Sequence, residues 1–206
     1  MTTYAYAPSL DAIVRGVSQR VAAPVVVAVS GFGGSGKTAL AAALACRLGA
    51  PVVGIDAFGT PAALVASADW GGLDRARLVR QVLAPLAAGA REVTYDRCDD
   101  WDTWRTTPAR LRVERHLVVE GVGLFHPGLL AWLHHRLWLD VPLATATARG
   151  IARDMARGQD TRALWEGVWA PTETAFARRF RPRDLADVVV RPCGEGPGRR
   201  AGASTS

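Results

Sequence analysis

Lysine is nearly absent from this chain of 206 residues. Lysine and arginine together number 25, and Lys37 is the only lysine. The net charge of +6 therefore comes almost entirely from arginine, in a sequence that is rich in alanine, glycine and arginine throughout. We interpret most of this charge as a solvated surface, and we expect no nucleic-acid partner.

Cysteine is scarce, and long apolar runs are missing. Cys46, Cys98 and Cys193 are far apart and form no CxxC pair, which excludes a zinc ribbon and argues against a disulfide framework. The apolar run 22–29 is far shorter than the ~20 residues of a membrane span, and the N-terminus lacks the features of a secretion signal. We therefore expect a cytoplasmic protein with no membrane partner.

Short apolar runs alternate with stretches of helical periodicity. Runs at 25–29, 52–55, 117–119, 137–139 and 188–190 predict strands, and the segments 9–21, 38–48, 74–88, 145–157 and 172–179 predict helices. This alternation predicts an α/β fold of three layers around a mainly parallel five-stranded sheet. We expect one domain over 1–191, with residues 1–8 frayed and 192–206 forming a disordered tail.

Residues 31–38 read GFGGSGKT and match the P-loop pattern GxxxxGK[ST] in full, between a predicted strand and a predicted helix. Glycines let successive backbone N–H groups point at phosphate oxygens, and the helix N-terminus adds a partial positive charge. Lys37 is expected to bind the β- and γ-phosphates of ATP, and the Thr38 hydroxyl to bind Mg²⁺. The residues expected to bind ATP are Gly31, Gly33, Gly34, Ser35, Gly36, Lys37, Thr38 and Ala39.

Two acids, Asp56 and Glu120, follow apolar strands. Ligands of open parallel sheets lie beyond the carboxyl ends of the strands, so both acids should lie beside the P-loop. One suits a general base for an acceptor hydroxyl, and the other suits a Mg²⁺ ligand. The alternative for either residue alone is a helix cap or a surface acid. Asp140 also ends a strand, and we interpret it as structural.

Three arginines, Arg149, Arg153 and Arg157, are spaced four apart and should share one helix face. Phosphoryl transfer needs cations over the transferred group, and a mobile helix can supply them as it closes. We therefore interpret residues from about 149 to 165 as a helical lid, while the alternative is a solvated basic face.

A regulatory nucleotide-binding ATPase with no acceptor is the competing function of another class.

The order of these motifs resembles the uridine kinase family of P-loop kinases, which is related to phosphoribulokinase and bacterial pantothenate kinase. The resemblance covers about 25–191 and rests on the P-loop, the segments 56–58 (DAF), 95–96 (YD) and 118–122 (VVEGV), and the pair Arg153-Asp154. It is greatest to small, Trp-rich uridine kinase-like proteins of high-GC bacteria, through the segments 101–102 and 141–143.

The resemblance implies roles for individual residues. Asp56 would be the base that accepts the proton of a sugar hydroxyl, Thr38 and Glu120 would bind Mg²⁺, and Arg153 and Arg157 would be the lid arginines. Asp56 is also a candidate for the metal site. The residues expected on the acceptor side are Phe58, Asp69, Trp70, Tyr95, Asp96 and Arg149.

Three departures from the family pattern concern the end of the lid and the acceptor. Gln159 and Gly167 stand where the family has an arginine and a base-reading glutamine, and the segment 99–101 (DDW) replaces a histidine. Phosphoryl transfer is thus better supported than uridine as acceptor. We expect a small hydroxylated acceptor, first a pyrimidine nucleoside, with pantothenate or a nucleoside-like natural product as alternatives. The sequence leaves a homo-oligomer open.

Overall fold

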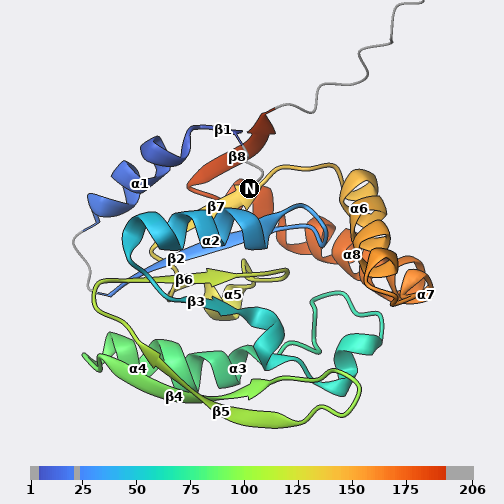
Figure 1. Cartoon of the computed structure of the whole chain (residues 1–206), viewed down its shortest axis with the longest axis horizontal. Helices are drawn as coiled ribbons and strands as arrows, with labels where there is room; N and C mark the ends of the chain where they lie inside the picture. Colours follow the sequence, from blue (N-terminus) through green and yellow to red (C-terminus); the bar gives the residue numbers. More distant parts are fainter. Residues whose placement is uncertain (1–4, 21–23, 194–206) are drawn as a thin grey trace, which may run out of the picture.

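A computed structural model describes residues 5–20 and 24–193, and it forms an α/β sandwich around one six-stranded sheet (Figure 1). The sheet order is β1-β8-β7-β2-β6-β3. Its strands are β1 (Ala5–Ala7), β2 (Val25–Gly31), β3 (Val52–Gly54), β6 (His116–Glu120), β7 (His135–Leu139) and β8 (Val188–Cys193). The five predicted strands are all present and run parallel, which confirms the predicted fold class.

Both ends of the described chain extend the sheet beyond the prediction. Residues 5–7 pair antiparallel with β8, so the expectation that 1–8 are frayed was wrong for these three residues. Pro192 and Cys193 belong to β8 and not to a tail. The expectation of disorder for 194–206 lies outside the described residues, as does that for 1–4.

The alternation of side chains along β2 explains why the sheet is covered on both faces. Val25, Val27 and Val29 pack with α1 (Leu10–Ser18) and α2 (Lys37–Leu48), whereas Val26 and Ala28 pack with the opposite helices. Those helices are α3 (Arg75–Leu78), α4 (Ala84–Ala87), α5 (Pro127–Leu130) and α8 (Ala170–Phe180). A strand buried on both faces is apolar without interruption, which is the pattern seen in the sequence.

One of the predicted helices contains a π-helical turn, and another π-helical turn precedes the last predicted helix. The helix predicted over 74–88 is α3, a π turn at Val79–Leu83 and α4, and Asp74 caps its start by accepting the Arg77 N–H at 2.9 Å. Near the C-terminus, α6 (Leu143–Ala156) and α7 (Arg162–Leu164) are followed by a π turn, η4 (Trp165–Trp169), and then by α8. In Figure 1 the helices α6 to α8 stand beside the end of the sheet at which β2 leads into α2.

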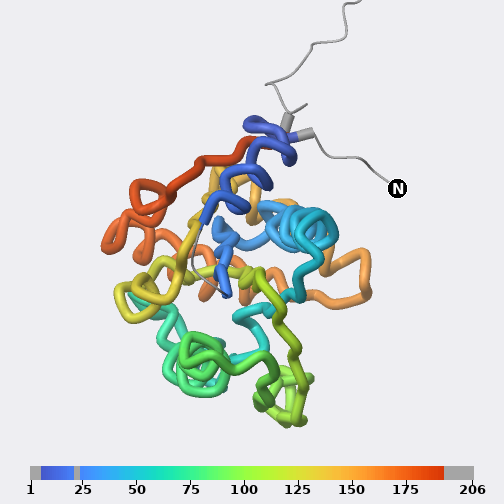
Figure 2. Tube along the Cα trace, turned by 90° about the vertical axis from the view of Figure 1, so that its left-hand side faces the viewer, coloured from blue at the N-terminus to red at the C-terminus, as the bar shows by residue number. Residues whose placement is uncertain are grey.

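A two-stranded antiparallel hairpin was not predicted. Its strands are β4 (Glu92–Cys98) and β5 (Thr106–Arg112), with Val93 opposite Leu111 and Tyr95 opposite Ala109. Figure 2 shows the hairpin with α3 and α4 at the end of the molecule away from α1. Within 5–20 and 24–193, the helices are too short or too polar to cross a membrane.

Candidate active site

The P-loop joins β2 directly to α2. Gly36 has φ +100° and stands at the N-terminal cap of α2, whose first residue is Lys37. Gly34 has φ +80°, and a Cβ there would lie 2.0 Å from the Ala146 carbonyl oxygen and 2.8 Å from the Gly150 nitrogen. Only glycine fits this position, because the backbone of α6 lies against the backbone of the loop.

Lys37 lies inside the loop with only 7% of its surface exposed. Its Nζ donates a hydrogen bond to the Phe32 carbonyl oxygen at 2.8 Å. Burial lowers the pKa of Lys37, whereas the negative charges of Glu173, Glu120 and Asp56 raise it. The charges of three carboxylates therefore act on the ammonium group, while its hydrogen-bond partner is a backbone carbonyl.

Asp56 lies two residues beyond the end of its strand. The strand β3 ends at Gly54, and Asp56 belongs to a 3₁₀ helix, Ile55–Phe58. Its side chain is accessible to solvent, yet protein atoms crowd around it. This loss of hydration raises the pKa of Asp56, while the charges of Lys37 and Arg153 lower it. The charges of Lys37 in the P-loop and Arg153 on α6 thus both act on this carboxylate.

Glu120 stands at the end of β6 and lies next to Gly54 in the pairing of β6 with β3. The Thr38 hydroxyl donates to its Oε1 at 3.3 Å. Burial raises the pKa of Glu120 and the charge of Asp56 raises it further, while Lys37 and the Thr38 hydrogen bond lower it. Two carboxylates that repel each other beside a hydroxyl form an oxygen donor set that suits Mg²⁺. In the described part of the chain no cluster of three His, Cys, Asp or Glu residues could hold a metal, so phosphate and water oxygens would complete its coordination.

Arg153 lies on α6 and is held in place by its neighbours. Its Nε donates to Asp154 Oδ1 at 2.8 Å, and its guanidinium lies 6.0 Å from the centroid of the Trp165 ring. Asp154 is 5% exposed and also accepts hydrogen bonds from Thr161 Oγ1 at 2.9 Å and Trp165 Nε1 at 2.8 Å. These contacts fix the guanidinium at the edge of the candidate site.

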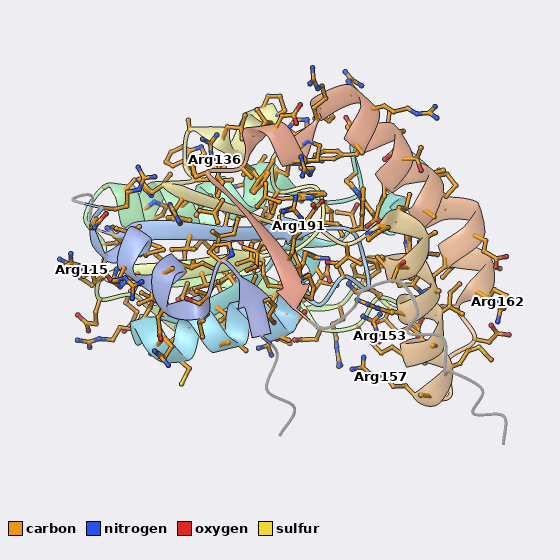
Figure 3. All side chains as sticks on the ribbon, turned by 90° about the horizontal axis from the view of Figure 1, so that it is seen from above. Arg115, Arg136, Arg153, Arg157, Arg162 and Arg191 are labelled. Atoms are coloured by element: carbon orange, nitrogen blue, oxygen red, sulfur yellow. The ribbon has the colours of Figure 1, made fainter. Side chains whose placement is uncertain are left out.

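The other two arginines of the predicted stripe are placed differently. Arg149 lies on α6, one turn before Arg153, and is half-buried. Arg157 is the exposed C-terminal cap of α6. Figure 3 shows Arg153 and Arg157 on the side of α6 that faces the body of the molecule, whereas Arg162 lies on the outer side.

The residues expected on the acceptor side are divided between two places. Phe58 is fully buried and stacks on Tyr95, with ring centroids 5.5 Å apart, so both rings belong to the core beneath Asp56. Asp96 is engaged by Gln81, which donates to Asp96 Oδ2 at 2.7 Å. At the second place, Trp70 is 5% exposed and lies against Gly123. Burial lowers the pKa of Arg75 and of His126, and the negative charge of Asp69 opposes this effect.

Comparison with solved structures identifies the fold. A "putative fructose transport system kinase" from Silicibacter sp. TM1040 aligns with a TM-score of 0.68 and 26% identity over 88% of this chain and 98% of that one. A "possible uridine kinase" from Bacillus stearothermophilus aligns with a TM-score of 0.67 and 18% identity over 87% and 96%. The chain has the fold of a P-loop kinase. No protein-family model and no curated protein sequence matches it.

Within this P-loop kinase fold, sequence reasoning missed Glu173 on α8. It is 3% exposed, and its Oε1 accepts a hydrogen bond of 2.5 Å from the Gly33 N–H. Its Oε2 is buried and has no hydrogen-bond partner among the described residues. Burial raises the pKa of Glu173 to about 7, although the Gly33 hydrogen bond and the charge of Lys37 lower it. The only signal in the sequence was an acid three residues before a core aromatic, Phe176.

Trp165 was also missed. Its ring is 4% exposed and lies in the space where a Cβ on Gly33 or Gly150 would stand, at 2.9 Å and 2.3 Å from ring atoms. The indole therefore fills a crevice between the P-loop and α6. A tryptophan in an apolar helix is equally compatible with any core position, so the sequence gives no sign of this contact.

The ionisation of Glu173 should make stability depend on pH. Between pH 4.5 and about 7 the folded chain keeps the Glu173 proton while the unfolded chain loses it, so stability falls as pH rises through this window. In the wild type this should lower the free energy of unfolding on the order of 2–3 kcal/mol, and we expect Glu173→Gln to remove this loss of stability. Melting temperatures of both proteins at pH 5 and pH 8 measure this effect. Identical pH profiles for the two proteins would contradict it.

Proposed function

We propose that the chain is an ATP-dependent phosphotransferase that moves the γ-phosphate of ATP to a hydroxyl of a small molecule. The observation that carries this proposal is that Lys37, Asp56 and Arg153 come from three different elements, and that the charge of Arg153 acts on the pKa of both Lys37 and Asp56. A phosphate-binding cation, a carboxylate and a lid cation that face one space are the groups that phosphoryl transfer needs.

Asp56 has the position and chemistry of the general base. Its raised pKa brings it closer to neutral pH, where it can accept a proton from an acceptor hydroxyl more readily than an ordinary carboxylate. Lys37 binds the phosphates in the ground state. Arg153 stabilises the charge on the transferred group, because its guanidinium is already oriented by Asp154.

Thr38 and Glu120 are the residues that would hold Mg²⁺, together with phosphate and water oxygens. Asp56 is close enough to Glu120 for its charge to contribute to the same site. When bound, the ion supplies positive charge that neutralises the phosphates of ATP.

Two kinds of small alcohol have support as the acceptor. The resemblance to uridine kinases favours a pyrimidine nucleoside, and the 26% identical neighbour named as a fructose transport system kinase favours a sugar. Next to Asp56, the ring of Trp101 lies against Gly59 and its Nε1 donates to the Asp56 carbonyl oxygen at 3.3 Å. The ring centroids of Trp104 and Trp101 are 5.3 Å apart. This side of the site is therefore an aromatic surface that suits the face of a base or a sugar ring.

A panel of acceptors tests the proposal. Uridine, cytidine, fructose and pantothenate are each incubated with MgATP or MgGTP, and ADP or GDP release is compared with the rate without acceptor. We expect at least one alcohol to raise the rate ~10-fold or more and to yield a phosphorylated product by mass spectrometry. Nucleotide hydrolysis that no alcohol accelerates would instead favour a regulatory ATPase.

A further inference from the structure

Glu173 on α8 is an unexpected group to find against a phosphate-binding loop. It is 3% exposed, and its carboxyl group lies beside a loop whose backbone N–H groups suit anions. Its Oε1 accepts a hydrogen bond from the Gly33 N–H, which belongs to the loop whose N–H groups suit phosphate. The chain thus supplies its own carboxyl group to this part of the loop.

Among the described residues, Lys37 on α2 is the charged side chain that acts on Glu173, and Glu173 is in turn the largest charge acting on Lys37. The other groups around it are apolar: Trp70, Trp138 and Phe176 line a void of about 10 Å³ beside the carboxylate, and Trp165 covers Gly33. Such a void is barely large enough for one water molecule, so a negative charge on Oε2 would be poorly solvated.

We propose that Glu173 is a positioning residue that holds the Gly33 N–H of the P-loop and binds a proton when a triphosphate pairs with Lys37. This inference rests on the proposed function, because it requires ATP to bind at the P-loop. The γ-phosphate and Glu173 compete for the same cation. Once Lys37 pairs with the phosphate, an ionised Glu173 would be left buried beside another anion.

The proton balance gives the direction of the effect. One proton moves from solvent to the Glu173 carboxylate as the nucleotide binds, since the phosphate charge raises the pKa of Glu173 above its value of about 7 in the free chain. The affinity for MgATP should therefore be highest below pH 7 and should fall as the pH rises above it. Asp56 and Glu120 also act on Lys37, but a Glu173 variant retains both of them.

Titration calorimetry with MgATP tests the proposal at pH 6.5, 7.5 and 8.5, in paired buffers that differ in ionisation enthalpy. We expect the wild-type affinity to fall ~10-fold or more across this range, with uptake of a proton above pH 7. Glu173→Gln should remove that part of the pH dependence and should bind MgATP more tightly than the wild type at pH 8.5.

Glu166→Gln is the matched control, because it makes the same change at an exposed glutamate. Glu166 lies on η4 and pairs with Arg162, so its variant should keep the affinity and the pH dependence of the wild type. A loss of pH dependence in this control as well would show that the effect does not come from the buried carboxylate.

MgADP supplies a test that needs no variant. It lacks the γ-phosphate, so its binding to the wild type should show a weaker pH dependence than that of MgATP. Equal pH profiles for MgATP and MgADP, or for wild type and Glu173→Gln, would overturn the inference and leave the kinase proposal standing. Absence of MgATP binding at every pH would overturn the proposed function itself.

Discussion

Replacing Arg153 with alanine is expected to lower kcat by ~10²- to 10³-fold, with a smaller effect on the affinity for ATP. Asp154 and Trp165 orient the guanidinium, so its charge can act on the transferred phosphoryl group with little further ordering of the side chain. Steady-state rates of ADP release with the acceptor found in the panel measure the effect.

Arg162→Ala is the matched control for this experiment. Arg162 belongs to the same predicted lid, but it lies on the outer side and pairs with Glu166, so its loss should leave kcat unchanged. Acceptor binding should also protect the amides of residues 149–162 from hydrogen exchange if the segment closes as a lid. Wild-type turnover in Arg153→Ala, without such protection, would mean that the arginines form an ordinary solvated face.

Asp56→Asn is expected to lower kcat by ~10²-fold or more while nucleotide binding survives. Asparagine keeps the shape of the side chain but cannot accept the proton. Because crowding raises the pKa of Asp56, the wild-type rate should fall on acidification at a higher pH than the ordinary value of 3.8 predicts. The rate of the variant should lack this inflection.

Asp11→Asn provides the comparison for Asp56→Asn. Asp11 is an exposed acid on α1 that pairs with Arg47, and its amide variant should keep wild-type kinetics. A fully active Asp56→Asn enzyme would remove Asp56 from the mechanism and would reassign base catalysis to another group.

The central sheet and the P-loop could be predicted because each depends on local sequence. A strand buried on both faces must be apolar at every position, as in Val25 to Val29, and the loop 31–38 needs glycine and lysine at fixed spacing. The hairpin was missed although buried residues such as Val93 and Tyr95 alternate with exposed ones in its first strand. This alternation is short, and Pro108 within the second strand argued against a strand there.

Contacts between distant segments could not be predicted in the same way. Glu173 lies 140 residues from Gly33, and nothing in the sequence around either residue specifies the other. The same holds for Trp165 in its crevice and for β1, whose three residues become a strand only because the edge of β8 is available. Asp56 and Glu120 were accessible to prediction because they lie at or just beyond the ends of strands at one edge of the sheet, and Thr38 because it belongs to the P-loop motif.

The contact between Gly34 and α6 has a mechanical consequence. Because no side chain separates the loop from the Ala146 carbonyl, the two backbones are in contact, and steric repulsion prevents any closer approach. Any shift of the loop that brings it toward α6 must therefore push the helix by the same distance. The position of α6, which carries Arg153, is thus coupled to the position of the P-loop. A single methyl group added at position 34 would keep the loop and the helix apart.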